Sequence, residues 1–221
     1  MQEPRTTQRT RRSSRAALAA RTGAALAALV TLALVGACNN RTTSVSLLPP
    51  GLIESETRRL VQAQGLAAEA YRTRDEEEAM RRYTEAVRIY RELPVAWNNL
   101  GVLLMKNERY VEASSAFTAA AELAPNDPRP VYNRGLLLDR RGYVIEARAE
   151  YARALERDGQ YLPALRAGIR ADARRNDGSM QTLEWVERAL MLEQDPAWIK
   201  WLRLQKIRIE NLPSIKAQIK G

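Results

Sequence analysis

A 34-residue periodicity in the middle of the chain constrains the fold more than any other feature of the sequence. Its most complete copy places a tryptophan, small residues, an aromatic ring and a proline in one order, as Trp97, Leu100, Gly101, Ala113, Phe117, Ala120 and Pro125. One period earlier these positions hold Leu66, Ala67, Ala79, Tyr83 and Ala86, and one period later Gly135, Ala147, Tyr151 and Ala154. A period of this length is typical of stacked helical hairpins, which grow along one axis and need no second core. We therefore expect one folded unit.

The spacing W-x2-L-G, then A-x3-F-x2-A, then P resembles the tetratricopeptide repeat family. The resemblance implies an all-α fold, a right-handed superhelical solenoid of antiparallel helix pairs. Small residues at the eighth and twentieth positions of each repeat would let its two helices approach closely. The ring at the twenty-fourth position would fill the space beside them, because protein interiors are packed as densely as crystals.

The repeat register also predicts the boundaries of the folded part. We expect a solenoid over 53–195, composed of repeats at 60–93, 94–127, 128–161 and a degenerate fourth at 162–195. In the fourth repeat Gly168 falls one residue early and Ala189 one residue late, which indicates a loop longer by two residues between its helices. A capping helix at 196–211 and a basic tail at 212–221 complete the prediction.

The N-terminal segment has the composition of an export signal. Six arginines and one glutamate occupy the first 21 residues, and an almost purely apolar run from Gly23 to Val35 follows. A basic head, an apolar run and small residues at its end are typical of a secretory signal peptide. The only cysteine of the chain, Cys38, stands directly after those small residues.

Val35-Gly36-Ala37-Cys38 resembles a bacterial lipobox. The resemblance implies that 1–37 is cleaved as a signal peptide, that Cys38 is lipidated, and that 38–52 tethers the folded part to a membrane. Asn39 in place of aspartate implies the outer rather than the inner membrane. The alternatives are an ordinary signal peptide or a retained membrane helix with an incidental cysteine, although the apolar run is shorter than the ~20 residues that span a bilayer.

Composition excludes several classes of function. The chain has no histidine, so serine-histidine hydrolysis and histidine metal sites are excluded, and one cysteine cannot form a thiolate metal cluster. Removing 1–37 takes away six arginines and one glutamate, and the formal charge falls from +9 to +4. A nucleic-acid partner therefore lacks support, because phosphate binding needs a basic folded surface. We expect no enzyme activity, no cofactor and no metal.

Ligands of the resembled family lie in a concave groove lined by the first helix of each repeat. Carrying that groove over by register predicts binding positions at Tyr71, Arg72, Asn98, Asn99, Val102, Met105, Lys106, Tyr132, Asn133, Leu136 and Arg140. Further groove positions are Val61, Gln64, Ala68, Val95, Arg129 and Asp139. The apolar members would form a floor for a peptide with one or two hydrophobic anchors.

The thirteenth position is basic in all three regular repeats, as Arg72, Lys106 and Arg140. Such a ladder of cations could hold a terminal carboxylate or an acidic peptide through charge-assisted hydrogen bonds. The alternative is that each cation only keeps a helix C-terminus soluble and complements its dipole.

The tryptophans are interpreted mainly as packing residues. Trp97 is a core position by its register, and Trp185 is expected to pack within the fourth repeat. Trp198 and Trp201 are three residues apart and share one face of the final helix. Packing of the cap is the expected role of this pair, and contact with a partner or a second copy is the alternative.

The resulting prediction is a lipid-anchored scaffold of the bacterial cell envelope that binds a partner peptide or protein of unidentified sequence. Its plan resembles the small tetratricopeptide lipoproteins that assist pilus secretin assembly or regulate peptidoglycan hydrolases. The alternative is a structural or assembly factor that associates with copies of itself.

Overall fold

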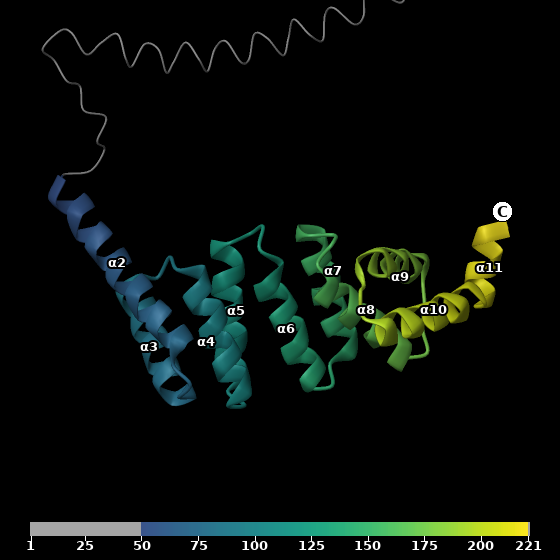
Figure 1. The fold of residues 1–221 in the computed structure, drawn as a ribbon, viewed down its shortest axis with the longest axis horizontal. Coiled ribbons are helices and arrows are strands. Elements are labelled where there is room, and N and C mark those ends of the chain that lie inside the picture. The colour runs from purple at the N-terminus through teal and green to yellow at the C-terminus, as the bar shows by residue number, and fades with distance from the viewer. Residues whose placement is uncertain (1–49, 221) are drawn as a thin grey trace, which may run out of the picture. The chain divides into compact units, whose positions relative to one another are not determined.

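A computed structural model describes residues 50–220 of the 221-residue chain. Every regular element in that range is an α-helix: α2 (Pro50–Arg72), α3 (Glu76–Ile89), α4 (Pro94–Lys106), α5 (Tyr110–Leu123), α6 (Pro128–Arg140), α7 (Val144–Arg157), α8 (Leu162–Arg174), α9 (Met180–Leu192), α10 (Pro196–Glu210) and α11 (Pro213–Lys220). From α3 to α11 each helix packs against the next, and the hairpins follow one another in a row (Figure 1). The all-helical solenoid expected from the repeat register is confirmed.

The glycine and ring positions meet as the register predicted. A Cβ atom on Gly101 would lie 2.6 Å from a ring carbon of Phe117, and one on Gly135 would lie 2.6 Å from a ring carbon of Tyr151. Both rings are completely buried. The paired helices can approach this closely only because position eight carries no side chain.

The fourth repeat keeps this contact in altered spacing. Gly168 faces Trp185, whose ring would be 2.7 Å from an added Cβ, and Trp185 is buried as expected. The loop between α8 and α9 covers 175–179, whereas the corresponding turns cover 107–109 and 141–143. The predicted two-residue gain in this loop is therefore confirmed.

Both ends of the solenoid extend beyond the predicted boundaries. Helix α2 begins at Pro50, inside the segment 38–52 that was predicted to be a tether. A proline is tolerated at the first helical position because its missing N–H would have no partner within the helix. At the other end, 212–221 was predicted to be a tail, but Pro213 opens the further helix α11, and Ile215 is only 2% exposed within the C-terminal core.

The predicted signal peptide 1–37 and lipidation site Cys38 lie outside the described residues. Within 50–220, no helix combines the length and the hydrophobicity that crossing a bilayer requires. The membrane-proximal part of the prediction therefore stays a prediction from sequence.

Candidate functional site

The predicted groove residues lie on α2, α4 and α6, the first helices of the three regular repeats, but they differ widely in exposure. Tyr71 is 80% exposed, and the three cations of the ladder are exposed as well. The other members, with one exception, are half-buried: Asn98, Asn99, Val102, Tyr132, Asn133 and Leu136.

Met105 is the exception, because it is only 6% exposed and belongs to the core. It lies four residues after Gly101, one helical turn along the face that packs against Phe117. The prediction that Met105 lines the groove was therefore wrong. Val102 and Leu136 also pack partly against the same core, so the apolar floor is smaller than expected.

The three groove asparagines form one hydrogen-bonded chain across the repeats. The Nδ2 group of Asn133 donates to Asn98 Oδ1 at 2.9 Å, and that of Asn98 donates to Asn99 Oδ1 at 3.3 Å. Asn99 Nδ2 in turn donates to the hydroxyl oxygen of Tyr83 at 3.1 Å. Because each amide keeps some hydrogen-bonding capacity, this chain can hold the groove surface in place and still contact a ligand.

The basic ladder is divided between paired and unpaired cations. Lys106 Nζ lies 2.6 Å from Glu76 Oε1 on α3. Arg174, 34 residues after Arg140, is a further cation that the sequence reasoning did not include, and it pairs with Asp139. Within residues 50–220, neither Arg72 nor Arg140 forms an ion pair. The ladder therefore does not present equivalent charges along its length.

A hollow of about 510 Å³ lies between α2 and α4 and reaches the start of α6. Its lining combines several predicted groove positions with a few neighbours: Gln64, Ala67, Ala68, Tyr71, Arg72, Leu93, Val95, Asn99 and Arg129. The guanidinium of Arg129 is held by Asp127, with Nε to Oδ1 at 2.9 Å and a terminal nitrogen to Oδ2 at 2.7 Å. This contact holds the pKa of the Asp127 carboxyl below its usual value. The hollow can offer a ring, an amide and the unpaired cation Arg72 to a ligand.

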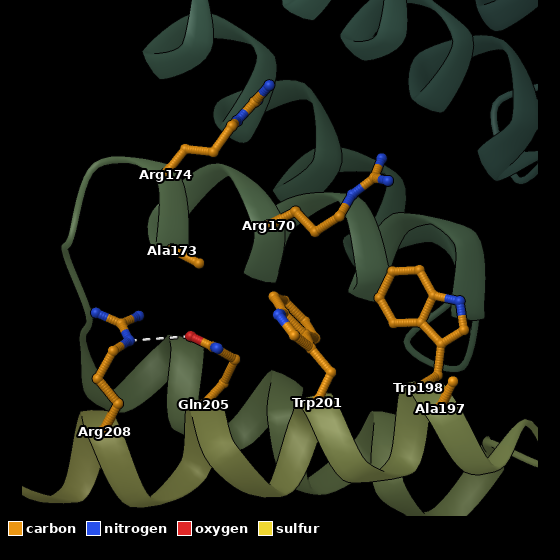
Figure 2. Close-up of a pocket in the computed structure, with 8 residues that line it drawn as sticks. All are labelled: Arg170, Ala173, Arg174, Ala197, Trp198, Trp201, Gln205 and Arg208. Atoms are coloured by element: carbon orange, nitrogen blue, oxygen red, sulfur yellow. Dashed lines mark hydrogen bonds between the residues drawn. The ribbon is translucent and has the colours of Figure 1, made fainter.

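A second, larger hollow of about 770 Å³ lies between α8 and α10 (Figure 2). Arginine and tryptophan dominate its lining, which consists of Arg170, Ala173, Arg174, Ala197, Trp198, Trp201, Gln205 and Arg208. The rings of Trp198 and Trp201 meet edge to face at a centroid distance of 5.4 Å, and both are only half-buried. The sequence reasoning placed this pair on one helical face but expected it to pack in the cap.

Comparison with a family model identifies the repeat at the centre of the chain. Residues 94–127 match the model described as tetratricopeptide repeat. The chain thus contains a tetratricopeptide repeat within an all-helical solenoid of the kind that such repeats form. No curated protein matched the chain in a sequence search.

Solved structures of similar fold include two of MamA. The MamA RS-1 ArsTM double mutant has a TM-score of 0.55 and 16% identity, over 73% of this chain and 91% of that one. A crystal structure of MamA has a TM-score of 0.54 and 17% identity, over 66% and 89%. The first TPR of Spaghetti (RPAP3), bound to HSP90 peptide SRMEEVD, has a TM-score of 0.49 and 19% identity, over 52% and 94%.

One buried side-chain oxygen within residues 50–220 has no hydrogen-bond partner there. The hydroxyl of Tyr151 is buried and makes no hydrogen bond to any residue of 50–220, and burial raises the pKa of this phenol. Tyr83, two repeats earlier, receives its hydrogen bond from Asn99. The residue in the corresponding place beside Tyr151 is Ala167, 68 residues after Asn99, and its methyl group has no donor.

The described residues contain no group of three or more histidine, cysteine, aspartate or glutamate side chains that could hold a metal ion. Both hollows can bind a ligand through charge-assisted hydrogen bonds and through contact with aromatic rings.

Proposed function

We propose that this protein is a membrane-anchored protein–protein interaction scaffold of the bacterial cell envelope, which binds a partner peptide or protein along α2, α4 and α6. The hollow between α2 and α4 carries the proposal. It gathers an exposed tyrosine ring and an unpaired arginine beside an amide that the fold holds in place. Exposed aromatic and arginine side chains are enriched at interaction surfaces, where they supply contact area and directional hydrogen bonds.

Tyr71 has the exposure expected of an anchor that meets a partner. Its side chain is 80% exposed, although burying an aromatic ring stabilises a protein by a few kcal/mol. Arg72 beside it is exposed, and no carboxylate within residues 50–220 pairs with it. A partner that covers both side chains gains apolar burial and a charge-assisted hydrogen bond together.

Site-specific photocrosslinking in intact cells tests the binding surface. A benzophenone amino acid replaces Tyr71 in one variant and Val111, on the second helix of repeat two, in the control. The two positions are matched, because Tyr71 is 80% and Val111 81% exposed and Val111 lines neither hollow. We expect a discrete adduct from position 71 and none from position 111. The same adducts from both positions would contradict the proposal.

Charge reversal sharpens the same test. Arg72→Glu should abolish the adduct, since it repels an acidic group without breaking an ion pair of the fold. Arg74→Glu makes the same change of charge two residues away and outside the hollow, and it should leave the adduct intact. Lys106 is a poor choice for this comparison because its replacement would also break the contact with Glu76.

The anchor is proposed from the sequence around Cys38, with the outer membrane as the expected location. Cell fractionation of wild type and Cys38→Ala, with mass spectrometry of the N-terminal fragment, tests it. We expect a diacylated or triacylated cysteine in the membrane fraction, and release of the variant from that fraction. A water-soluble wild-type product with an unmodified thiol would remove the anchor from the proposal.

Self-association is the alternative function. Sedimentation velocity over a concentration series distinguishes self-association from the proposed scaffold function, because a scaffold that binds a partner peptide should remain monomeric by itself. A concentration-dependent dimer that Arg72→Glu leaves unchanged would favour the alternative.

A further inference from the structure

We propose that the hollow between α8 and α10 is a separate binding site for an acidic peptide segment with an apolar side chain between its carboxylates. This site lies outside the three regular repeats. It shares no lining residue with the hollow between α2 and α4.

The shape of the site follows from one small residue. Five residues after the glycine of the helix contact stand Lys106 in repeat two and Arg140 in repeat three, but the small residue Ala173 in repeat four. Side chains of α10 rise from below toward α8 and Ala173, while Arg170 and Arg174 extend from α8 on the side away from α10 (Figure 2). A longer side chain at 173 would project into this space, so the alanine leaves the site open.

The charge of the site is not balanced by the fold. Arg170 makes no ion pair or hydrogen bond within residues 50–220, and Arg208 donates only to uncharged acceptors. These acceptors are Gln205 Oε1 at 2.9 Å, the carbonyl oxygen of Asp177 at 2.9 Å and Asn176 Oδ1 at 3.4 Å. Arg174 alone has a carboxylate partner, Asp139.

Three arginines therefore line the hollow, and Asp139 is the one carboxylate within residues 50–220 that pairs with any of them. The neighbouring Arg166 shows the contrasting arrangement, because the buried carboxylate of Glu193 neutralises it at 2.5 Å. A ligand in the hollow must therefore carry negative charge. Carboxylates are suited to this, because they are negative and match the planar guanidinium group in geometry.

The tryptophans explain why a peptide fits better than a bare anion. Arg166 and Arg170 lie over the ring of Trp198, at 4.6 and 5.9 Å from its centroid, which holds the Arg170 guanidinium at the rim of the hollow. Trp201 stands on α10 between Gln205 and Trp198, in the middle of the lining (Figure 2). The centre of the site is thus apolar and its ends are cationic. An apolar side chain can contact Trp201 while flanking carboxylates reach Arg170 and Arg208.

Isothermal titration of the full-length chain with the blocked peptide Gly-Asp-Asp-Leu-Asp-Asp-Gly tests the site. Tryptophan fluorescence provides a second readout, since Trp198 and Trp201 line the hollow. We expect saturable binding that weakens with added salt, because the ligand charges are partly exposed. The peptide with asparagine in place of every aspartate should not bind.

Two variants locate the binding. Arg170→Gln should weaken it about tenfold to a hundredfold, in line with the loss of a charge-assisted hydrogen bond, and Ala173→Leu should abolish it by projecting into the hollow without changing the charge. Arg203→Gln is the matched control, since it removes the same charge from an exposed position of α10 outside the lining.

Several results would overturn the site. These are failure of the wild type to bind the acidic peptide, equal binding of the asparagine peptide, and equal weakening by Arg170→Gln and Arg203→Gln. Tyr71→Ala separates this proposal from the function proposed above, because it should leave binding of the acidic peptide unchanged. Loss of binding with Tyr71→Ala and not with Ala173→Leu would place the ligand in the other hollow.

Discussion

Repeat two, 94–127, and repeat four, 162–195, join their paired helices by different means. In repeat two the contact is apolar: Gly101 admits the ring of Phe117, and the remaining space is filled by Ala113 and other buried alanines of α5. In repeat four the glycine and ring remain, but a buried polar network lies beside them. The Oγ1 group of Thr182 donates to Asp172 Oδ2 at 2.7 Å, across the contact between α8 and α9.

The shift in register explains the network. Thr182 takes the place that the small residues Ala113 and Ala147 hold in the two preceding repeats, but it stands 35 and not 34 residues after Ala147. A buried hydroxyl must find a partner, so Asp172 accepts its hydrogen bond, and a buried carboxylate must in turn be neutralised. Arg148 Nε, 2.6 Å from Asp172 Oδ1, supplies that charge from the preceding repeat. A drift of one residue has thus exchanged apolar packing for a chain of polar contacts that links two repeats.

The largest expected effect comes from breaking this network. Asp172→Ala leaves Arg148 and Thr182 without their partner at a site where the Asp172 side chain is 3% exposed, and should lower the free energy of unfolding by about 3 kcal/mol. Lys106→Ala removes a comparably short but exposed ion pair with Glu76 and should cost less than about 1 kcal/mol. Urea unfolding of both variants measures the difference. Equal losses would show that repeat four does not depend on its buried charges.

A methyl group on the regular helix contact tests the other half of the comparison. Gly101→Ala places a Cβ against the buried ring of Phe117 and should destabilise the fold by about 1–2 kcal/mol, despite the better helix propensity of alanine. Gly65→Ala in α2 is the control, since nothing lies within 4 Å of the added Cβ. It should stabilise the protein by about 0.5–1 kcal/mol. Thermal unfolding distinguishes the two signs, and stabilisation by both changes would contradict the close packing.

The two ring hydroxyls provide a smaller contrast with opposite signs. Tyr83→Phe removes the hydrogen bond from Asn99 and should cost about 1 kcal/mol. Tyr151→Phe removes a buried hydroxyl with no partner within residues 50–220, and should stabilise the protein by up to about 1 kcal/mol. Chemical denaturation of both variants against wild type measures the pair. A loss from Tyr151→Phe as large as that from Tyr83→Phe would mean that the Tyr151 hydroxyl is hydrogen-bonded.

The smallest effect concerns pH and the carboxylate of Glu193 in the loop before α10. Burial raises the pKa of Glu193, but hydrogen bonds from Arg166 and from the backbone N–H groups of Asp195 and Gln194 bring it below its ordinary value of 4.5. A lowered pKa in the folded state adds stability above the unfolded-state value, and this contribution is lost as the pH falls through the folded-state value. Glu193→Gln should therefore be less stable than wild type near neutral pH and should converge with it in acid. Melting temperatures from about pH 7 to about pH 3 check this, and a gap that is constant with pH would refute it.

The periodic part of the sequence predicted most of the fold. Contacts within one repeat, such as Gly101 with Phe117, are set by spacing along two adjacent helices, so a local pattern is sufficient to find them. The ends were predicted less well, because the pattern stops there. Ile215 packs in the C-terminal core and so holds α11 against it. The repeat pattern has no position that predicts this contact.

The candidate sites were predicted only in part, for a similar reason. Register placed Tyr71, Arg72 and Asn99 on one surface, and the hollow between α2 and α4 gathers them. It also placed Met105 there, because a family position does not show how far a given helix is rotated toward its partner. The hollow between α8 and α10 was missed because α10 follows the last repeat, where the register names no groove position, and because the width of the hollow depends on how the two helices pack.

The sequence by itself determined the helices, their pairing and the residues at which each pair makes close contact, because these follow from a period of 34 and from side-chain size. Only the tertiary structure decided which polar groups are already satisfied. The amides of Asn98 and Asn133 bond to each other across repeats, Lys106 pairs with Glu76, and Arg170 lines a hollow without an ion pair or hydrogen bond within residues 50–220. Such partners stand some 30 residues apart in the chain, and whether a charge is neutralised or left for a ligand depends on distances that only the packed helices set.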